Sequence, residues 1–176
     1  LPLLFKKKIV NLIKKKTKKI LSALYGRLNL ANSIFVHRDY HSQNLMKIGG
    51  KIGVIDSQDA LIGNPSYDLV SLIDDVRLKT SKKLKRKIYN YYIKKNIYNS
   101  KKFSEDFNIL SVQRNLKIIG IFSRLFERDK KAQYLKFIPY TWQLLGMRME
   151  SKIFNDLRNI FDNYIPKKRR SKIINK

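Results

Sequence analysis

A short stretch in the first third of the chain brings together one carboxylate, one amide and a second carboxylate. Asp39 follows His37 and Arg38, Asn44 comes after four further residues, and Asp56 lies beyond a pair of glycines. A loop carboxylate can accept the proton of an attacking hydroxyl group, and amide and carboxylate oxygens are ligands that Mg²⁺ takes in proteins. These residue types predict a general base, Asp39, beside a Mg²⁺ site formed by Asn44 and Asp56.

The spacing of these residues supports the same chemistry. His37-Arg38-Asp39, four residues and then Asn44 read H-R-D-x-x-x-x-N, which is the pattern of the catalytic loop of protein kinases. A three-residue match alone is weak, because such triplets recur by chance and Asp39 could simply cap a turn. The whole arrangement of strand, loop, hairpin and Asp56 is far more specific and favours phosphoryl transfer.

Local patterns predict the elements that would position this stretch. Apolar residues recur at helical spacing over 3–24, and Gly26 suits the end of that helix. Residues 33–36 form a β-branched and aromatic run, which predicts a strand leading into the loop. Two further runs, 45–48 and 51–55, flank two glycines and predict a β-hairpin with Asp56 at its exit.

Beyond Pro65 the sequence predicts helices. The expected helices are 67–78, one capped by Ser81, a long one opened by Ser104 with Glu105 and Asp106 in its first turn, one with Pro139 in its first turn, and one beginning at Ser151. After Pro166 we expect a frayed basic tail. The predicted fold is therefore α+β and mostly helical, with a folded unit over 1–165 and a tail over 166–176.

The composition fits one compact unit. The chain has 176 residues, 43% of them hydrophobic, and no cysteine, which excludes disulfides and thiolate chemistry. No apolar run is long enough to cross a bilayer, and nothing resembles a secretory leader, so we expect a cytoplasmic protein.

The charge is unevenly distributed. A formal net charge of +26 first suggests a nucleic acid or an anionic membrane as partner. However, residues 39–75 contain six acidic and two basic residues, a net of −4, so this window is the exception in a basic chain. A codon supply that favours Lys, Ile and Asn explains the general excess without any polyanionic partner.

The residues around these motifs resemble a known family. The runs FVHRDYHSQNLM and GVIDSQDALIGNPSYDLVSLIDD are similar to the C-terminal lobe of the aminoglycoside phosphotransferase and choline kinase-like family. More narrowly, they resemble bacterial anomeric sugar kinases that phosphorylate N-acetylmuramate and N-acetylglucosamine in cell-wall recycling. The stretch QRNLKIIGIFSRLFERDKKAQYLKFIP at 113–139 also resembles that subgroup.

The resemblance implies a role for each matching residue. Asp39 would be the catalytic base, and Asn44 and Asp56 would be the ligands of Mg²⁺. His37 and Arg38 would be loop scaffold, and Asp68 would brace the loop from a helix start. ATP and Mg²⁺ are the implied cofactors, and a small hydroxyl-bearing molecule is the implied acceptor. His41 and Asp59 are interpreted as a packed loop residue and an ordinary loop carboxylate.

The chain departs from the family pattern in two places. Ser57 stands where these sugar kinases usually carry an aromatic residue after the metal-binding aspartate. Only the helix over 1–25 precedes the loop, so we expect the C-terminal lobe of a protein kinase-like fold with its N-terminal lobe largely absent. Such a lobe would be needed for full ATP binding, because in this fold it supplies the lysine and the phosphate-covering loop.

The acceptor site is less well defined by the sequence. Arg114, Asn115 and Arg124 lie in the stretch that resembles the sugar kinases and are candidates for binding the substrate. Arg114 falls on the packed side of its helix, where it could reach a ligand or pair with a buried carboxylate. Tyr140 and Trp142 could stack on a sugar, although packing is the more favoured interpretation.

Three alternative functions remain open at this point. Aminoglycoside, choline and homoserine kinases share the same catalytic pattern. The chain could also be an inactive truncated lobe, which ATP and Mg²⁺ titration would test. A protein of another class, a basic nucleic-acid-binding protein, would bind with a steep inverse dependence on salt.

Overall fold

A computed structural model describes residues 7–170 of the chain. In chain order the elements are α1 (Lys7–Tyr25), β1 (Ile34–Val36), the 3₁₀ helix η1 (Ser42–Asn44), β2 (Leu45–Ile48), β3 (Lys51–Val54), β4 (Leu61–Gly63), α2 (Tyr67–Ile73), α3 (Lys82–Lys95), α4 (Ser100–Asp129), η2 (Ala132–Phe137), α5 (Ile138–Arg148), η3 (Lys152–Phe154), α6 (Asn155–Tyr164) and α7 (Lys167–Arg170). The mostly helical α+β prediction is confirmed. None of the helices within 7–170 is long and apolar enough to cross a membrane.

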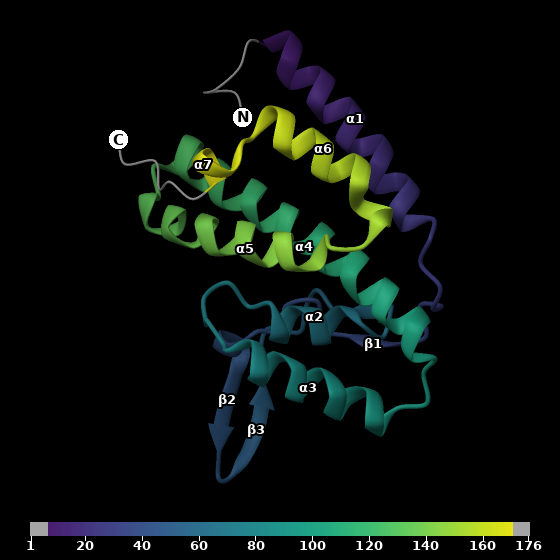
Figure 1. Ribbon diagram of the computed structural model, residues 1–176. Helices are drawn as coiled ribbons and strands as arrows, with labels where there is room; N and C mark the ends of the chain where they lie inside the picture. The colour runs from purple at the N-terminus through teal and green to yellow at the C-terminus, as the bar shows by residue number, and fades with distance from the viewer. Residues whose placement is uncertain (1–6, 171–176) are drawn as a thin grey trace.

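Two small antiparallel sheets carry the strands. β2 and β3 form the predicted hairpin, with Leu45 opposite Val54, and it projects away from the helices in Figure 1. Its turn contains Gly49 at φ 52° and Gly50 at φ 80°. Both are left-handed conformations, which glycine adopts without strain. The second sheet pairs β1 with β4, which the sequence analysis did not predict.

The long helix α4 organises the core. It runs diagonally through the molecule in Figure 1 and packs on α5, α2 and α1. Its Ile109 and Val112 join a cluster with α1, α5 and α6, and its Phe103 and Phe107 join a second cluster with α2 and α3. Phe122 belongs to a third cluster with α5 and η2. Successive parts of α4 therefore cover the apolar faces of different sets of neighbours, with α5 packing on two of them.

The predicted start of α4 at Ser104 is wrong. The helix begins at Ser100, and the side chain of Asn99 caps it by accepting a hydrogen bond from Lys102 N at 3.0 Å. Asp106 does not lie in the first turn. Its buried carboxylate accepts hydrogen bonds from Asn29 N at 2.8 Å and Leu30 N at 2.9 Å, and so ties the segment after α1 to α4.

Helix α2 is shorter than predicted. It ends at Ile73 rather than at residue 78, because Asp75 Oδ1 accepts a hydrogen bond from Arg77 N at 3.0 Å and offers the backbone a turn in place of the helix. The predicted end of α1 before Gly26 is confirmed. So is the cap at Ser81, whose hydroxyl accepts from Leu84 N at 3.1 Å.

The C-terminal predictions are confirmed in part. Pro139 lies in the first turn of α5 as expected. Ser151 precedes a 3₁₀ turn, and the fifth predicted helix itself begins only at Asn155. The frayed tail is wrong for Lys167–Arg170, which form α7, where Arg170 Nη2 donates to Asp162 Oδ1 at 2.7 Å. The rest of the predicted tail, 171–176, lies outside the described residues.

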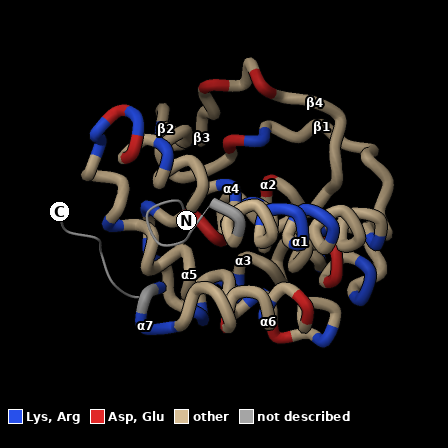
Figure 2. Tube along the Cα trace, turned by 90° about the horizontal axis from the view of Figure 1, so that it is seen from above, with Lys and Arg blue, Asp and Glu red and all other residues tan. Residues whose placement is uncertain are grey.

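The charge distribution matches the sequence pattern. Figure 2 shows lysine and arginine spread over most of the helices, while the segment that joins β3 to β4 carries acidic residues. That segment contains Asp56 and Asp59. The acidic window therefore divides between the strand region, with Asp39, Asp56 and Asp59, and helix α2 with its C-terminal end, where Asp68, Asp74 and Asp75 lie.

Candidate active site around Asp39

The loop of residues 37–44, here called the Asp39 loop, follows directly from β1 and is fastened at its start by Asp68. This carboxylate lies in the first turn of α2 and accepts hydrogen bonds from His37 N at 2.7 Å and Arg38 N at 3.0 Å. Arg38 has a φ of 73°, a left-handed conformation that a non-glycine residue keeps only when its surroundings hold it. The two bonds are what the bracing interpretation of Asp68 requires, and that role stays a prediction.

A second carboxylate, which the sequence analysis missed, fastens the far end of the Asp39 loop. Asp75 Oδ2 accepts hydrogen bonds from Ser42 N at 3.1 Å and from the Ser42 hydroxyl. Burial alone would raise the pKa of Asp75, but the bonds from Ser42 and from Arg77 N outweigh it, so the pKa lies below its ordinary value. The signal in the sequence was the adjacent carboxylate pair Asp74-Asp75 inside the acidic window.

Hydrogen bonds also join the Asp39 loop to the hairpin. Asn44 Nδ2 donates to Asp39 O at 3.0 Å, and Asn44 O accepts from Ile55 N at 3.1 Å. The ring of His37 is buried and its Nε2 lies 3.0 Å from Ile55 O. Asp56 follows at once, exposed and with a φ of 71°. The structure therefore brings the segments that carry Asp39, Asn44 and Asp56 to one end of the hairpin.

The donor set fits a magnesium ion rather than an all-protein metal cage. Within residues 7–170 there is no group of three or more His, Asp or Glu side chains that could hold a metal. The amide nitrogen of Asn44 donates to Asp39 O, so its oxygen can accept or ligate, and Asp56, the residue after Ile55 that bonds Asn44 O, is exposed. Mg²⁺ is commonly bound by one or two such protein groups together with phosphates and water.

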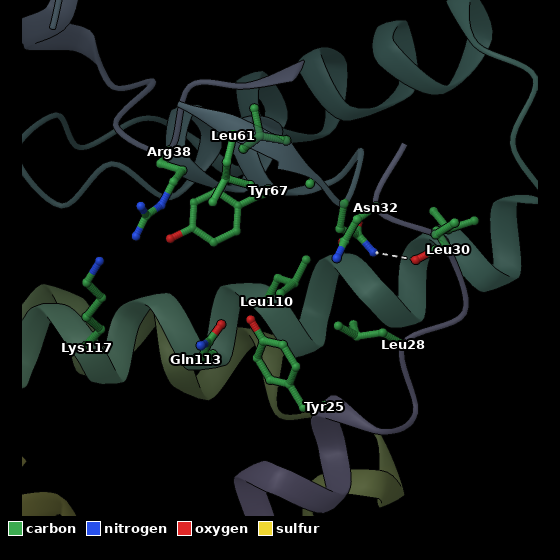
Figure 3. A pocket seen from close by; sticks show the side chains of 14 residues that line it. Tyr25, Leu28, Leu30, Asn32, Arg38, Leu61, Tyr67, Leu110, Gln113 and Lys117 are labelled. Carbon is green, nitrogen blue, oxygen red and sulfur yellow. Dashed lines mark hydrogen bonds between the residues drawn. The ribbon is translucent and has the colours of Figure 1, made fainter. Parts of the chain in front are cut away.

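A cavity of about 620 Å³, here called the main cavity, opens between α1, the β1–β4 sheet, α2 and α4. Figure 3 shows apolar side chains, Leu28 and Leu30, at one end and the cations Arg38 and Lys117 at the other. The hydroxyl of Tyr67 points toward the charged end. The cavity therefore has an apolar and a polar end, as pockets for small polar molecules usually do.

A smaller cavity of about 90 Å³, here called the loop cavity, lies beside it and includes Asp39. Arg38, Tyr67 and Lys117 line both cavities. The remaining lining residues of the loop cavity are Asp39, His41, Arg77, Arg114, Ile118, Ile121 and Phe122. The predicted base thus lies in the wall of a cavity that adjoins the main cavity.

Arg114 is the predicted substrate residue that reaches this cavity. Its Nη1 is buried and has no hydrogen-bond partner within the described part of the chain, where no carboxylate pairs with it either. Burial lowers the pKa of Arg114, although Tyr67, Asp75 and Asp39 oppose the shift. Of the two interpretations, pairing with a buried carboxylate is therefore wrong for residues 7–170.

The other two substrate candidates lie elsewhere. Asn115 is fully buried and donates to Ser111 O at 2.9 Å, while Arg124 is exposed, and neither lines the main cavity or the loop cavity. A substrate role for them stays a prediction. Trp142 packs edge-to-face on Phe161 with ring centroids 5.2 Å apart, which agrees with the packing interpretation.

The two weaker loop candidates are also placed. His41 is buried, as predicted, and it lines the loop cavity. Burial and the positive charge of Arg77 lower the pKa of His41 below its ordinary value, so its ring is held neutral. Asp59 contributes its backbone carbonyl, which accepts from Arg38 Nη1 at 3.3 Å.

Comparison with known proteins identifies the family. Residues 14–97 match the family described as "Phosphotransferase enzyme family". N-acetylmuramate/N-acetylglucosamine kinase of Caulobacter vibrioides is 31% identical over 140 residues, which are 76% of this chain and 39% of that protein. The kinase of the same name from Neisseria meningitidis serogroup B is 40% identical over 113 residues, 60% of this chain and 34% of that protein.

A third relative with that name, from Pseudomonas aeruginosa, is 38% identical over 119 residues, which are 64% of this chain and 35% of that protein. The chain thus spans little more than a third of the length of these relatives. The resemblance that the sequence suggested is confirmed. The match to the phosphotransferase enzyme family covers the segment that contains Asp39, Asn44, Asp56 and Asp68.

Proposed function

We propose that the chain supplies the general base, the metal ligands and the acceptor site of a kinase that phosphorylates a hydroxyl group of an amino sugar. The observation that carries this proposal is the two-sided fastening of the Asp39 loop. Asp68 holds its start and Asp75 holds Ser42 near its end, while Asp39 itself faces a cavity. Phosphoryl transfer depends mainly on positioning, so a rigid loop that presents an unpaired carboxylate suits it.

Each residue has a defined part in the proposed reaction. Asp39 accepts the proton of the acceptor hydroxyl as its oxygen attacks the γ-phosphorus of ATP, and the bond to the β-phosphate oxygen breaks. Asn44 Oδ1 and the Asp56 carboxylate would hold Mg²⁺, which when bound would neutralise charge on the phosphates. His37 and Arg38 act only through the loop conformation that Asp68 holds.

The main cavity is the proposed acceptor site. Its volume of about 620 Å³ falls within the ordinary range for small-molecule pockets. A sugar ring offers hydroxyl groups to the end with Tyr67 and Arg38, and an acetyl methyl group suits the end with Leu28 and Leu30. The names of the relatives support N-acetylmuramate or N-acetylglucosamine as acceptor, and with it a role in cell-wall recycling.

The proposal treats the chain as the C-terminal lobe of a kinase-like fold. The lysines of α1 stand on a helix and not on a strand, so they do not match the strand lysine that pairs with ATP phosphates in such folds. We therefore expect full ATP binding to need an N-terminal lobe in addition to residues 1–176. Because ATP is the phosphate donor, the cytoplasm is the expected location.

Transfer of labelled γ-phosphate tests the proposal. The chain, alone and joined to a family N-terminal lobe, is incubated with ATP, Mg²⁺ and each acceptor in turn: N-acetylmuramate, N-acetylglucosamine, choline, homoserine and an aminoglycoside. We expect transfer to the amino sugars, and a loss of about 10²- to 10⁴-fold in Asp39→Asn, because the general base is removed. Asp162→Asn, an exposed carboxylate on α6, is the control. Wild-type transfer by Asp39→Asn would rule out the role of Asp39.

A further inference from the structure

We infer that the loop cavity is a subsite for a carboxylate group carried by the acceptor, and that Arg77 and Arg114 bind it. The inference rests on the proposed function and adds what decides between acceptors. It concerns the part of the site that adjoins the main cavity through Arg38, Tyr67 and Lys117.

The side chains that line the loop cavity carry mostly positive charge. Four cations, Arg38, Arg77, Arg114 and Lys117, line the loop cavity, against one carboxylate, Asp39. Within residues 7–170 none of the four forms a salt bridge. Asp75 lies close enough to act electrostatically on Arg77 and Arg114, but its oxygens already accept hydrogen bonds from Ser42 and from Arg77 N. The cavity therefore keeps an excess of positive charge.

Arg114 has a buried hydrogen-bond donor that is unsatisfied within the described residues. The side chain of Arg114 is almost completely buried, with 6% of the residue exposed, and its Nη1 has no acceptor among the described residues. A buried donor without a partner is costly, and the cost is larger for a charged group. Native structures rarely keep such a group without a reason. An oxygen of a ligand in the loop cavity would supply the missing acceptor.

The loop cavity is small and has an apolar wall. At about 90 Å³, it is far smaller than the main cavity of about 620 Å³, so it suits a short branched acid better than a sugar ring. Ile118, Ile121 and Phe122 form an apolar wall that suits a methyl group. Because the two cavities share lining residues, one molecule can place its ring in the main cavity and an acidic side arm in the loop cavity.

The two sugars in the names of the relatives differ by such an arm. N-acetylmuramate is N-acetylglucosamine with a lactyl ether, which has one methyl group and one carboxylate. The subsite therefore predicts that the chain prefers N-acetylmuramate and that Arg77 and Arg114 are the residues that determine this preference. A charge-assisted hydrogen bond contributes more than a neutral one.

Binding measurements on the 176-residue chain test this without any need for catalysis. Calorimetric titration with each sugar should give a lower Kd for N-acetylmuramate. Arg77→Gln and Arg114→Gln should each raise that Kd by about 10- to 100-fold and leave the Kd of N-acetylglucosamine unchanged. Arg114→Lys, which keeps the charge, should raise the Kd of N-acetylmuramate by a smaller factor than Arg114→Gln. Arg128→Gln, an exposed arginine on the same helix, is the matched control, and circular dichroism checks that each variant folds.

Three outcomes would overturn the subsite. One is that neither sugar binds, and another is that the variants weaken both sugars equally. The third is that the Kd of inorganic phosphate depends on Arg77 and Arg114 while the preference between the two sugars does not. That result would assign the cavity to the transferred phosphoryl group. The transfer assay separates the two proposals. If both sugars are phosphorylated and bind with equal Kd, the proposed kinase function stands and the subsite is overturned. If N-acetylmuramate binds more tightly but no phosphate is transferred, the subsite stands and the proposed kinase function is overturned.

Discussion

Two arginines near α4, the buried Arg114 and the partly buried Arg148, are in opposite states. Arg148, on α5, donates to Asp74 twice, from Nε at 2.8 Å and from Nη2 at 2.9 Å. The same carboxylate accepts from the hydroxyl of Ser111 on α4 at 2.6 Å and lies 3.5 Å from the ammonium group of Lys85 on α3. Arg114, one turn further along α4 from Ser111, has a buried Nη1 with no partner in the described part of the chain.

The difference separates charges that are paired within the fold from the charges that we propose bind a ligand. Asp74 is fully buried at the end of α2 and joins that helix to α3, α4 and α5. Burial alone would raise the pKa of Asp74, but the bonds from Arg148 and Ser111 more than compensate, and its pKa is lowered. Asp74 has its partners within the protein, whereas none of the four cations that line the loop cavity forms a salt bridge within residues 7–170.

Removing the buried carboxylate should give the largest effect. In Asp74→Asn the buried ammonium of Lys85 and the partly buried guanidinium of Arg148 lose their counter-charge. Breaking a buried pair in this way costs about 3 to 5 kcal/mol of unfolding free energy. Urea denaturation of the 176-residue chain measures it, with the surface pair mutant Glu105→Gln as control, for which about 0 to 1 kcal/mol is expected. A loss below about 1 kcal/mol for Asp74→Asn would contradict the structural role.

Acid should weaken the same network by protonating it. The folded-state pKa of Asp74 lies below the unfolded value of 3.8, so its stabilisation is complete above that pH and is lost as the pH falls through the folded pKa. The difference in unfolding free energy between the wild type and Asp74→Asn should therefore be constant above pH 3.8 and shrink below it. Denaturation curves of both proteins across this range measure the difference. A difference that grows in acid would mean that the carboxylate is not stabilised in its charged form.

Loosening the Asp39 loop should have a smaller effect on stability. Ser42→Ala removes the hydroxyl that donates to Asp75 but keeps the bond from Ser42 N. We expect a loss of about 1 kcal/mol in unfolding free energy and, if the proposed reaction is correct, a roughly tenfold lower transfer rate from poorer positioning of Asp39. Ser33→Ala, an exposed serine before β1, is the control. An unchanged rate would show that Asp75 does not position the loop.

The smallest change in stability should come from Arg114. Arg114→Gln removes a buried charge but breaks no ion pair, so the unfolding free energy should change by less than about 1 kcal/mol. Arg148→Gln, at the other arginine, should cost more, up to the loss in Asp74→Asn, because Asp74 then keeps only Lys85 and Ser111 as partners. The two glutamine variants form a matched pair in chemical denaturation. Equal losses in both would remove the distinction between a structural and a ligand-binding arginine.

Several features of the fold follow from residues close together in sequence. Two adjacent glycines between strand-forming runs suffice for the β2–β3 hairpin, because they alone adopt the left-handed turn without strain. The start of α4 could not be predicted, since Asn99 and Ser104 are both good caps. Phe103 decides between them, because it is completely buried against Tyr89, Tyr92 and Tyr98 only if the helix begins before it.

The same division holds at the candidate site. The sequence by itself determined which residues are candidates for the chemistry, because Asp39, Asn44 and Asp56 carry a recognisable spacing within one short stretch. Only the tertiary structure decided what surrounds Asp39. The bond between Ser42 and Asp75, the pairing of β1 with β4, and the loop cavity with Arg77 and Arg114 all join segments that are distant in the chain. Such contacts depend on how helices pack, and no local pattern of residue types encodes them.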